Sequence, residues 1–350
     1  MKRQSFWFIV AIGILASCTQ IIFTATASVA QTQAGYLRSF RSWCEAKNSI
    51  SPQTKHTVEV LLKKAGSQDC LQAERNLYDL EELNIAYLDV NDLRPLGTFT
   101  NLTSLALDGN GITDISPLSS LKSLTKLGLG WNSLEDLTPL ANLTNLTELN
   151  LAYNRLQNLT PLSSLNKLTK LYLYSNQIHD LRPLFSLNNL ETLDLSDNEI
   201  ESLEGLSHST QLTYLVLSFN QIKDLTPLSS LINLTDLDLG ENQIEDLTPL
   251  SSLTNLIELL VESNQIRELT PLQSLNNLDT IDLSHNQVSD LSPLSNLASL
   301  KRIYFGNNQV RQVTNVLELD KLYEFCSAQN PLIETIPRRT TQHRENCLFL

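Results

Sequence analysis

The chain has 350 residues, of which 41% are hydrophobic and 18% are charged, and its formal net charge at pH 7 is −13. This balance is typical of a globular chain that buries a large core. The acidity argues against a nucleic-acid partner, since phosphate binding needs clustered Lys and Arg. It is compatible with a cationic partner and also with simple solubility.

Residues 1–30 have the organisation of an export signal. Lys2 and Arg3 precede an apolar run over residues 6–16, and small residues follow. We therefore expect a bacterial protein that is exported to the periplasm, the cell surface or the medium. No later segment is apolar over the roughly 20 residues that a membrane span needs, so we expect no span in the mature chain.

Two processing sites compete within this signal. Ala30 ends a small-residue motif that suits ordinary signal peptidase, whereas residues 15–18 match a bacterial lipobox in which Cys18 is lipidated. We expect cleavage after Ala30, because residues 21–23 are too apolar for the flexible tether that usually follows a lipidated cysteine. Lipidation at Cys18 and a retained membrane anchor remain the alternatives.

Residues 36–79 are predicted to form a helical N-terminal cap. Ser51 and Pro52 suit the N-cap and the first position of a helix, and Gly66 suits its end. Four apolar residues recur at helical spacing between them: Val58, Leu61, Leu62 and Ala65.

A 22-residue repeat dominates the remainder of the chain. Its pattern is LxxLxLxxNxIxDLxPLxxL, and about 12 units fill residues 80–335. The repeated asparagines, here called the ladder asparagines, are Asn110, Asn132, Asn154, Asn176, Asn198, Asn220, Asn242, Asn264, Asn286, Asn308 and Asn330. Pro recurs in the same phase, with Gly205 in its place in one unit, where we expect a bend.

Each part of the repeat has a structural role. The alternating leucines of LxL predict a strand with one buried face. Asn is expected to bond the backbone of a tight bend, so stacked units would form an asparagine ladder inside the molecule. Asp-Leu-Thr-Pro-Leu predicts a short helical turn on the far side. The fold class is therefore an α/β leucine-rich-repeat solenoid, with a curved parallel sheet on its concave face and 3-10 or helical turns on its convex face.

Four cysteines lie in two pairs, one at each end of the repeats. A solenoid holds its ends far apart, so of the three possible pairings we expect Cys44–Cys70 and Cys326–Cys347. Four free thiols are the alternative. The tail, residues 336–350, is predicted to fold back across the last strand as a C-terminal cap.

The 22-residue repeat over residues 80–335 resembles that of the bacterial internalin family of leucine-rich-repeat proteins. The resemblance implies an exported protein that binds a partner through its concave sheet. The same repeat class is similar to intracellular phosphatase regulators, which makes an enzyme scaffold or regulator the alternative function.

The sequence holds no pattern typical of a catalytic centre. None of the five histidines lies at metal-ligand spacing from another His or Cys, and no phosphate-binding loop is present. We therefore predict no enzyme activity, no cofactor and no metal. When the units are aligned on the repeat, five carboxylates fall close together: Asp194, Asp236, Asp238, Glu258 and Asp282. We expect a solvated acidic face there, and a Ca²⁺ site is the alternative.

The variable positions around each strand predict where a partner binds. An aromatic group comprises Trp131, Tyr153, Tyr172, Tyr174, Tyr214 and Phe219, with Val216 beside them. An acidic group comprises Asp236, Asp238, Glu258 and Asp282, with Glu241 and Glu262 beside them. Exposed aromatic residues are common binding anchors, and acids steer basic partners. We predict that a monomer binds a basic protein or a surface glycan here, although the aromatics would otherwise only cover the sheet edge.

Overall fold

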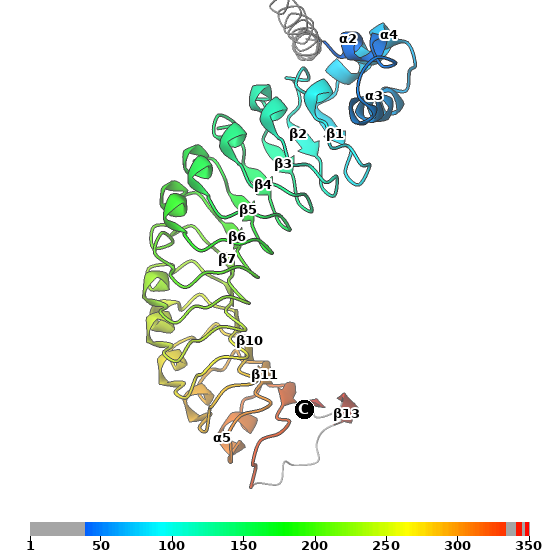
Figure 1. Cartoon of the computed structure of the whole chain (residues 1–350). Coiled ribbons are helices and arrows are strands. Elements are labelled where there is room, and N and C mark those ends of the chain that lie inside the picture. Colours follow the sequence, from blue (N-terminus) through cyan, green and yellow to red (C-terminus); the bar gives the residue numbers. More distant parts are fainter. Residues whose placement is uncertain (1–38, 334–340, 345–346, 350) are drawn as a thin grey trace, which may run out of the picture. The chain divides into compact units, whose positions relative to one another are not determined.

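The computed structural model describes residues 39–333 with their side chains, and the backbone of residues 341–344 and 347–349 (Figure 1). The predicted signal at residues 1–30 and the candidate lipidation site Cys18 lie outside the described residues. The chain divides after Tyr78 into two compact units, which are taken separately below.

From residue 39 onward, the first unit contains three helices, α2 (Phe40–Glu45), α3 (Pro52–Ala65) and α4 (Cys70–Tyr78). Helix α3 is the one predicted from the sequence. The Ser51 hydroxyl accepts a hydrogen bond from the Thr54 N–H at 3.2 Å, and Gly66 ends the helix in the left-handed conformation with φ of 66°. The four residues of its predicted apolar face are all buried.

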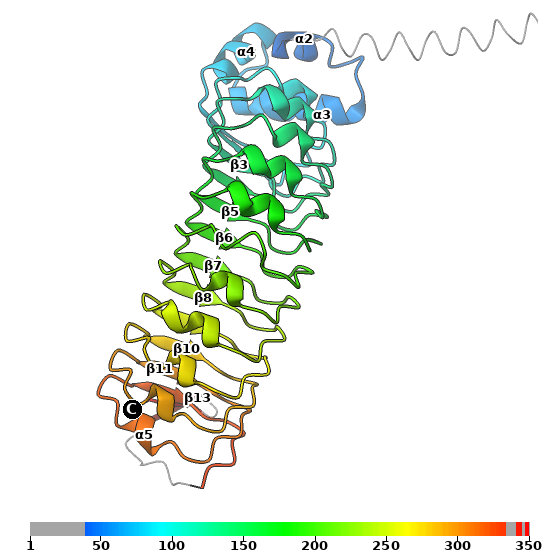
Figure 2. The ribbon, with the colours of Figure 1, turned by 90° about the vertical axis from the view of Figure 1, so that its left-hand side faces the viewer.

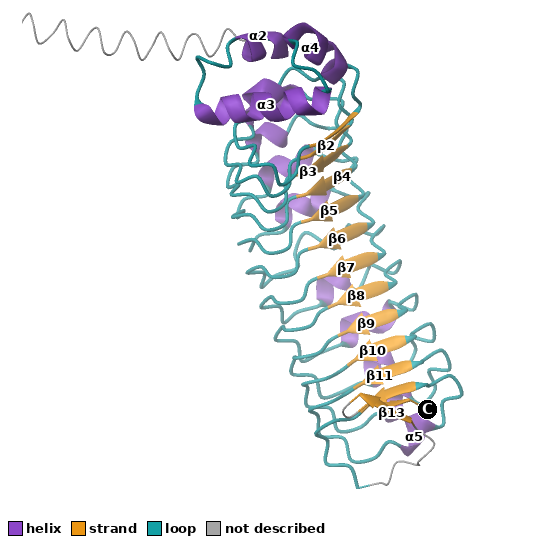
Figure 3. Ribbon diagram, turned by 90° about the vertical axis from the view of Figure 1, so that its right-hand side faces the viewer, coloured by secondary structure: helices purple, strands orange, loops and turns teal. Residues whose placement is uncertain are grey.

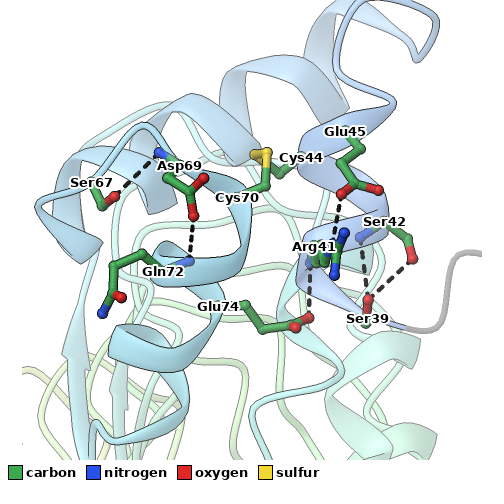
Figure 4. The surroundings of a disulfide bond; sticks show 10 residues. All are labelled: Ser39, Arg41, Ser42, Cys44, Glu45, Ser67, Asp69, Cys70, Gln72 and Glu74. Carbon is green, nitrogen blue, oxygen red and sulfur yellow. Dashed lines mark hydrogen bonds and ion pairs between the residues drawn. A yellow bond between two sulfur atoms is a disulfide. The ribbon is translucent and has the colours of Figure 1, made fainter.

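A disulfide joins Cys44 of α2 to Cys70 at the start of α4, with 5.6 Å between their Cα atoms (Figure 4). Polar contacts follow the same path. The Arg41 N–H donates to the Glu74 carboxylate at 2.8 Å, and the Asp69 carboxylate accepts the Gln72 N–H at 2.8 Å in the first turn of α4. The disulfide and these hydrogen bonds therefore hold α2 and α4 in place. Both helices are too short to be stable in isolation.

The second unit is built on twelve parallel strands that follow one another in sequence order. They are β1 (Glu82–Asn84), β2 (Ser104–Ala106), β3 (Lys126–Gly128), β4 (Glu148–Asn150), β5 (Lys170–Tyr172), β6 (Thr192–Asp194), β7 (Tyr214–Val216), β8 (Asp236–Asp238), β9 (Glu258–Leu260), β10 (Thr280–Asp282), β11 (Arg302–Tyr304) and β12 (Glu324–Cys326). Each residue pairs with the residue 22 positions later, as Leu149 does with Leu171. The strands face the viewer in Figure 3, and their outward face is called the strand wall below.

Short helical turns form the opposite side of this unit (Figure 2). They are η1 (Arg94–Leu96), η2 (Ser116–Ser120), η3 (Thr138–Leu140), η4 (Thr160–Ser164), η5 (Arg182–Ser186), η6 (Thr226–Leu228), η7 (Thr248–Ser252), η8 (Thr270–Leu272), η9 (Ser292–Leu294) and the α-helical turn α5 (Thr314–Leu317). These turns form because Asp and Pro recur at fixed positions of the repeat. The Asp136 carboxylate accepts the Thr138 N–H at 2.8 Å, and Pro139 stands in the first turn, where its lack of an N–H leaves no hydrogen bond unmade. This arrangement confirms the predicted leucine-rich-repeat solenoid.

The unit that carries Gly205 has turns in place of a 3-10 helix between β6 and β7. Gly205 adopts φ of 110°, and a Cβ there would collide with the carbonyl oxygen of Leu181 in the preceding unit. Close approach of two backbones therefore explains the glycine. The bend expected at this position stays a prediction.

The ladder asparagines connect each unit to the one before it. The Asn220 side-chain nitrogen donates to the carbonyls of Leu217 and Ser218 in its own unit and to that of Leu195 in the preceding unit, at 3.0 to 3.2 Å. Its side-chain oxygen accepts the Ile200 N–H at 3.0 Å. One buried amide thus satisfies four backbone groups that water cannot reach.

Three further ladders run along the exposed surface, and the sequence patterns had not indicated them. The Asn233 amide donates to the Thr210 carbonyl at 2.8 Å, the Thr235 hydroxyl to the Thr213 carbonyl at 3.0 Å, and the Ser230 hydroxyl to the Ser207 carbonyl at 2.8 Å. Side chains that look like ordinary polar surface therefore bridge adjacent units.

The edge of β12 is covered by backbone that returns along it. Strand β14 (Cys347–Phe349) pairs antiparallel with β12 and places Cys347 opposite Cys326, and β13 (Thr341–Arg344) pairs with β14. Cys326 is disulfide-bonded. The side chain of Cys347, its predicted partner, lies outside the described residues.

Replacing a ladder asparagine is expected to destabilise the protein far more than replacing a surface asparagine. Asn220→Ala leaves buried backbone groups unpaired and should lower the free energy of unfolding by about 3 kcal/mol. Asn233→Ala, which loses one exposed hydrogen bond, should cost less than about 1 kcal/mol. Chemical denaturation measures both, and equal losses would contradict the role given to the buried ladder.

Removing the Cys44–Cys70 disulfide is expected to loosen the first unit selectively. The double variant Cys44→Ser/Cys70→Ser should lose roughly 2–4 kcal/mol of stability there, because the crosslink restricts the unfolded chain. Amide hydrogen exchange measures the effect as faster exchange in α2 to α4. The amides of β5 to β9 are the internal control, and unchanged exchange in the helices would disprove the contribution of the crosslink.

Candidate functional site

Three positions of every unit direct side chains away from the leucine core. In β5, Lys170 and Tyr172 flank the buried Leu171, and Tyr174 follows the buried Leu173. The first and third strand residues and the second residue before each ladder asparagine therefore supply the strand wall. The alternation of strand side chains fixes this pattern.

The residue directly before each ladder asparagine forms a left-handed bend. Its φ lies between 51° and 58° before ten of the eleven ladder asparagines, and Gly109 has φ of 67° before the other. Tyr87, which precedes Leu88, adopts the same conformation with φ of 57°. Non-glycine residues rarely adopt this conformation, and the asparagine amide that bonds the adjoining carbonyls holds it. Trp131, Tyr153 and Phe219 occupy the bend, beyond the strands on which the sequence had placed them.

Three of the predicted aromatic residues form one cluster, called the aromatic cluster below. The rings of Trp131 and Tyr153 are stacked with centroids 3.7 Å apart, and Tyr153 meets Tyr174 edge to face at 5.2 Å. Trp131 is nevertheless 51% exposed and Tyr153 is 38% exposed. Pairing rigidifies these rings and leaves their apolar surface in water.

The remaining aromatic residues stand apart from this cluster. Tyr172 and Tyr214 lie on β5 and β7, and Phe219 follows β7, where it is 60% exposed. Among residues 39–333, none of the three makes a ring contact with the cluster. Val216 is buried.

Several predicted acidic residues bond to the backbone of their own unit. The carboxylates of Asp194, Asp238 and Asp282 each accept the N–H two residues later, at 3.0, 3.0 and 2.8 Å. The Asp236 carboxylate accepts the Thr235 hydroxyl at 2.6 Å, and Glu258 lies beside Asp236 in the sheet register. Asp at the third strand position therefore stabilises the bend, as Asn150 does in its unit.

Glu262 is the most perturbed carboxyl group of the acidic region. Burial, followed by the nearby charges of Asp238, Asp282 and Glu241, raises its pKa to about 7. Its Oε2 atom is buried without a hydrogen-bond partner, and its carboxylate lies against Gly240. No group of three or more His, Cys, Asp or Glu residues in the described part of the chain has the geometry to hold a metal ion.

One polar residue of the strand wall escaped the sequence analysis. The Asp108 carboxylate accepts the Gly130 N–H at 2.9 Å and the Asn150 amide at 3.1 Å, and it lies against Gly128. Partial burial raises its pKa. The position two residues before the ladder asparagine carries Ala, Gly or Ser in every unit except those of Asp108, Tyr174 and Glu262. Comparing this position across the units would have singled out Asp108.

Comparisons with known proteins agree with this architecture. A family model described as Leucine Rich repeats (2 copies) matches residues 100–142 and, in overlapping copies, residues 144–321. An internalin (inlF) from Listeria monocytogenes is 31% identical, with 79% of this chain and 89% of that chain covered and a TM-score of 0.69. The chain therefore belongs to the leucine-rich-repeat proteins and is internalin-like within them.

More distant structures share the fold alone. A leucine-rich-repeat protein of Leptospira interrogans is 23% identical with a TM-score of 0.61, over 74% of this chain and 80% of that one. The ectodomain of an Arabidopsis thaliana receptor kinase, solved in complex with Casparian strip integrity factor 2, is 20% identical with a TM-score of 0.54, over 73% and 43%. The comparison with curated protein sequences finds no match. Within the described residues, no helix has the length and apolarity to cross a membrane.

The pKa of Glu262 predicts a stability change between pH 4.5 and 7. The folded state holds this proton more tightly than the unfolded state, so its stabilising effect is complete below pH 4.5 and is lost as the pH rises through about 7. Glu262→Gln should therefore be more stable than the wild type at pH 8 by about 1 kcal/mol, a value discounted for partial exposure. Thermal unfolding at pH 4.5 and pH 8 measures this, and parallel pH profiles for the two proteins would refute it.

Proposed function

We propose that the protein is an exported binding protein that recognises a protein partner through its strand wall and the bends that adjoin it. The observation that carries this proposal is the aromatic cluster, which leaves large apolar rings in water on a rigid repeat scaffold. Exposed aromatic residues of this kind are costly in a free protein and are frequent anchors in interfaces. Because the left-handed bends and the ring pairing restrict these side chains, binding costs little conformational entropy.

The similarity to an internalin supports recognition as the function class. The plant receptor ectodomain was solved with Casparian strip integrity factor 2, which adds a fold-level analogy for protein binding. A surface glycan remains the alternative partner, because rows of aromatic rings also suit sugar rings. A scaffold or enzyme regulator is less well supported, since such a protein needs neither an export signal nor disulfides.

Export is part of the same proposal. The signal predicted at residues 1–30, the Cys44–Cys70 disulfide and the disulfide-bonded Cys326 all suit an oxidising compartment. We infer a secreted, periplasmic or surface-held bacterial protein, with lipidation at Cys18 as one means of retention.

A pull-down with matched variants tests the proposed function. Residues 31–350, with disulfides intact, are used as bait against extracellular and envelope extracts. The variant Trp131→Ala/Tyr153→Ala/Tyr174→Ala should bind the captured partner at least about 100-fold more weakly, because interface energy concentrates in such anchors. Calorimetry with the purified partner measures the affinity.

Phe185→Ala is the control, because Phe185 is equally exposed and lies on η5, away from the strand wall. It should bind like the wild type. Equal affinity of the triple variant and the wild type, with both folded, would refute recognition through the strand wall. Capture of a glycan in place of a protein would leave the surface assignment standing and correct the partner class.

A further inference from the structure

Asp108 lies in a part of the strand wall where the next unit lacks two side chains that would displace it. A Cβ on Gly128 would collide with the Asp108 carboxylate, and one on Gly130 would lie 3.0 Å from its Oδ1 atom. The Gly130 N–H and the Asn150 amide both bond to that oxygen. Glycines in the next unit and an asparagine two units away therefore hold a charged group at a fixed place.

Two exposed rings flank the unit that carries Asp108. The bend residue of this unit is Gly109, and the Tyr87 ring from the preceding unit lies so close that a Cβ on Gly109 would collide with it. Trp131 is the bend residue of the following unit. The ring that stacks on it, Tyr153, comes from the unit after that, so Gly109 and Tyr153 belong to the units on either side of Trp131. Tyr87 is 67% exposed and Trp131 is 51% exposed.

The units of a parallel sheet follow one another at about 4.8 Å, so the backbones that carry Tyr87 and Trp131 are about 10 Å apart. The leucine core needs neither ring, since both project from the bend. The nearby Lys126 lies 3.7 Å from the Glu148 carboxylate, so this cation is directed to another partner. The group of Tyr87, Asp108 and Trp131 therefore combines a negative charge with two aromatic faces.

We infer that Tyr87, Asp108 and Trp131 form a site for one arginine side chain of the partner protein. A guanidinium group forms charge-assisted hydrogen bonds to a carboxylate while it stacks on aromatic rings, whereas a neutral side chain or a sugar brings no charge to the carboxylate. The net charge of −13 favours the approach of a basic segment. This inference rests on the proposed function and specifies the chemistry of its partner.

The test uses the full protein and two peptides that differ only in charge. The probe is acetyl-Gly-Arg-Gly-amide, and the matched peptide carries citrulline, which has the shape of arginine without its charge. Titration followed by Trp fluorescence should show saturable binding of the arginine peptide and at least about 10-fold weaker binding of the citrulline peptide. Equal response to the two peptides would overturn the inference.

Variants assign the effect to the site. Asp108→Asn keeps an oxygen for the Gly130 N–H and should weaken arginine binding at least about 10-fold. Asp136→Asn, which precedes η3 on the opposite side of the unit and keeps an oxygen for the Thr138 N–H, should leave it unchanged. Tyr87→Leu provides a second variant that spares the hydrogen bonds of Asp108, and it should also weaken binding. Melting temperatures verify that each variant is folded. Unchanged binding in both site variants would overturn the inference. It would also be overturned if an oligomer of N-acetylglucosamine bound in place of the peptide, with equal affinity for the wild type and Asp108→Asn.

The partner captured in the pull-down separates the two claims. If it binds Asp108→Asn as tightly as the wild type but is lost by the triple aromatic variant, recognition through the strand wall stands and the arginine site is wrong. If neither variant affects it, the proposed function itself fails.

Discussion

The buried asparagine ladder is the constraint on which the rest of the repeat unit depends. Each ladder asparagine bonds backbone groups of two units, so a unit one residue longer or shorter would leave them unpaired inside the core. The strict spacing of 22 residues follows from this requirement. The same bonds hold the preceding residue in a left-handed bend, and that bend projects Trp131 and Tyr153 beyond the strands. Tyr87 adopts the same conformation before Leu88. The candidate site is thus a consequence of the ladder.

The sequence was sufficient to predict the leucine core, the strand wall, the turns opposite it and helix α3, because hydrophobic period and capping residues determine them locally. The conformation of the bend was not predictable from Trp131 or Tyr153 themselves, since it is imposed by the bonds that the following asparagine makes within its own unit and to the preceding one. Asp108 was missed for a related reason. Its position depends on Gly128 and Gly130, which lie 20 and 22 residues later and become its neighbours only through the sheet register.

The edge of β12 shows how the repeat array ends. A parallel strand at the end of a sheet offers unpaired backbone groups to any other strand, which favours aggregation. Strand β14 occupies that edge in antiparallel register, and the cysteine of β12 is disulfide-bonded. Because the returning chain is not a repeat, it cannot accept a further unit. The array therefore ends without a polar terminal repeat, and β12 is paired on both sides, by β11 and by β14.

The two halves of the predicted binding surface differ in how far the fold itself uses their side chains. Asp194, Asp238 and Asp282 bond the backbone of their own bends, so a ligand that took these carboxylates would have to replace those bonds. The rings of Trp131 and Tyr153 contact each other, and this contact leaves apolar surface exposed. A partner that bound this surface would therefore gain more from the aromatic half, by covering surface that water solvates poorly, than from these three acids, each of which already accepts a backbone hydrogen bond. The acidic half then acts mainly through its long-range field, which salt screens, whereas contact with the aromatic half is short-ranged.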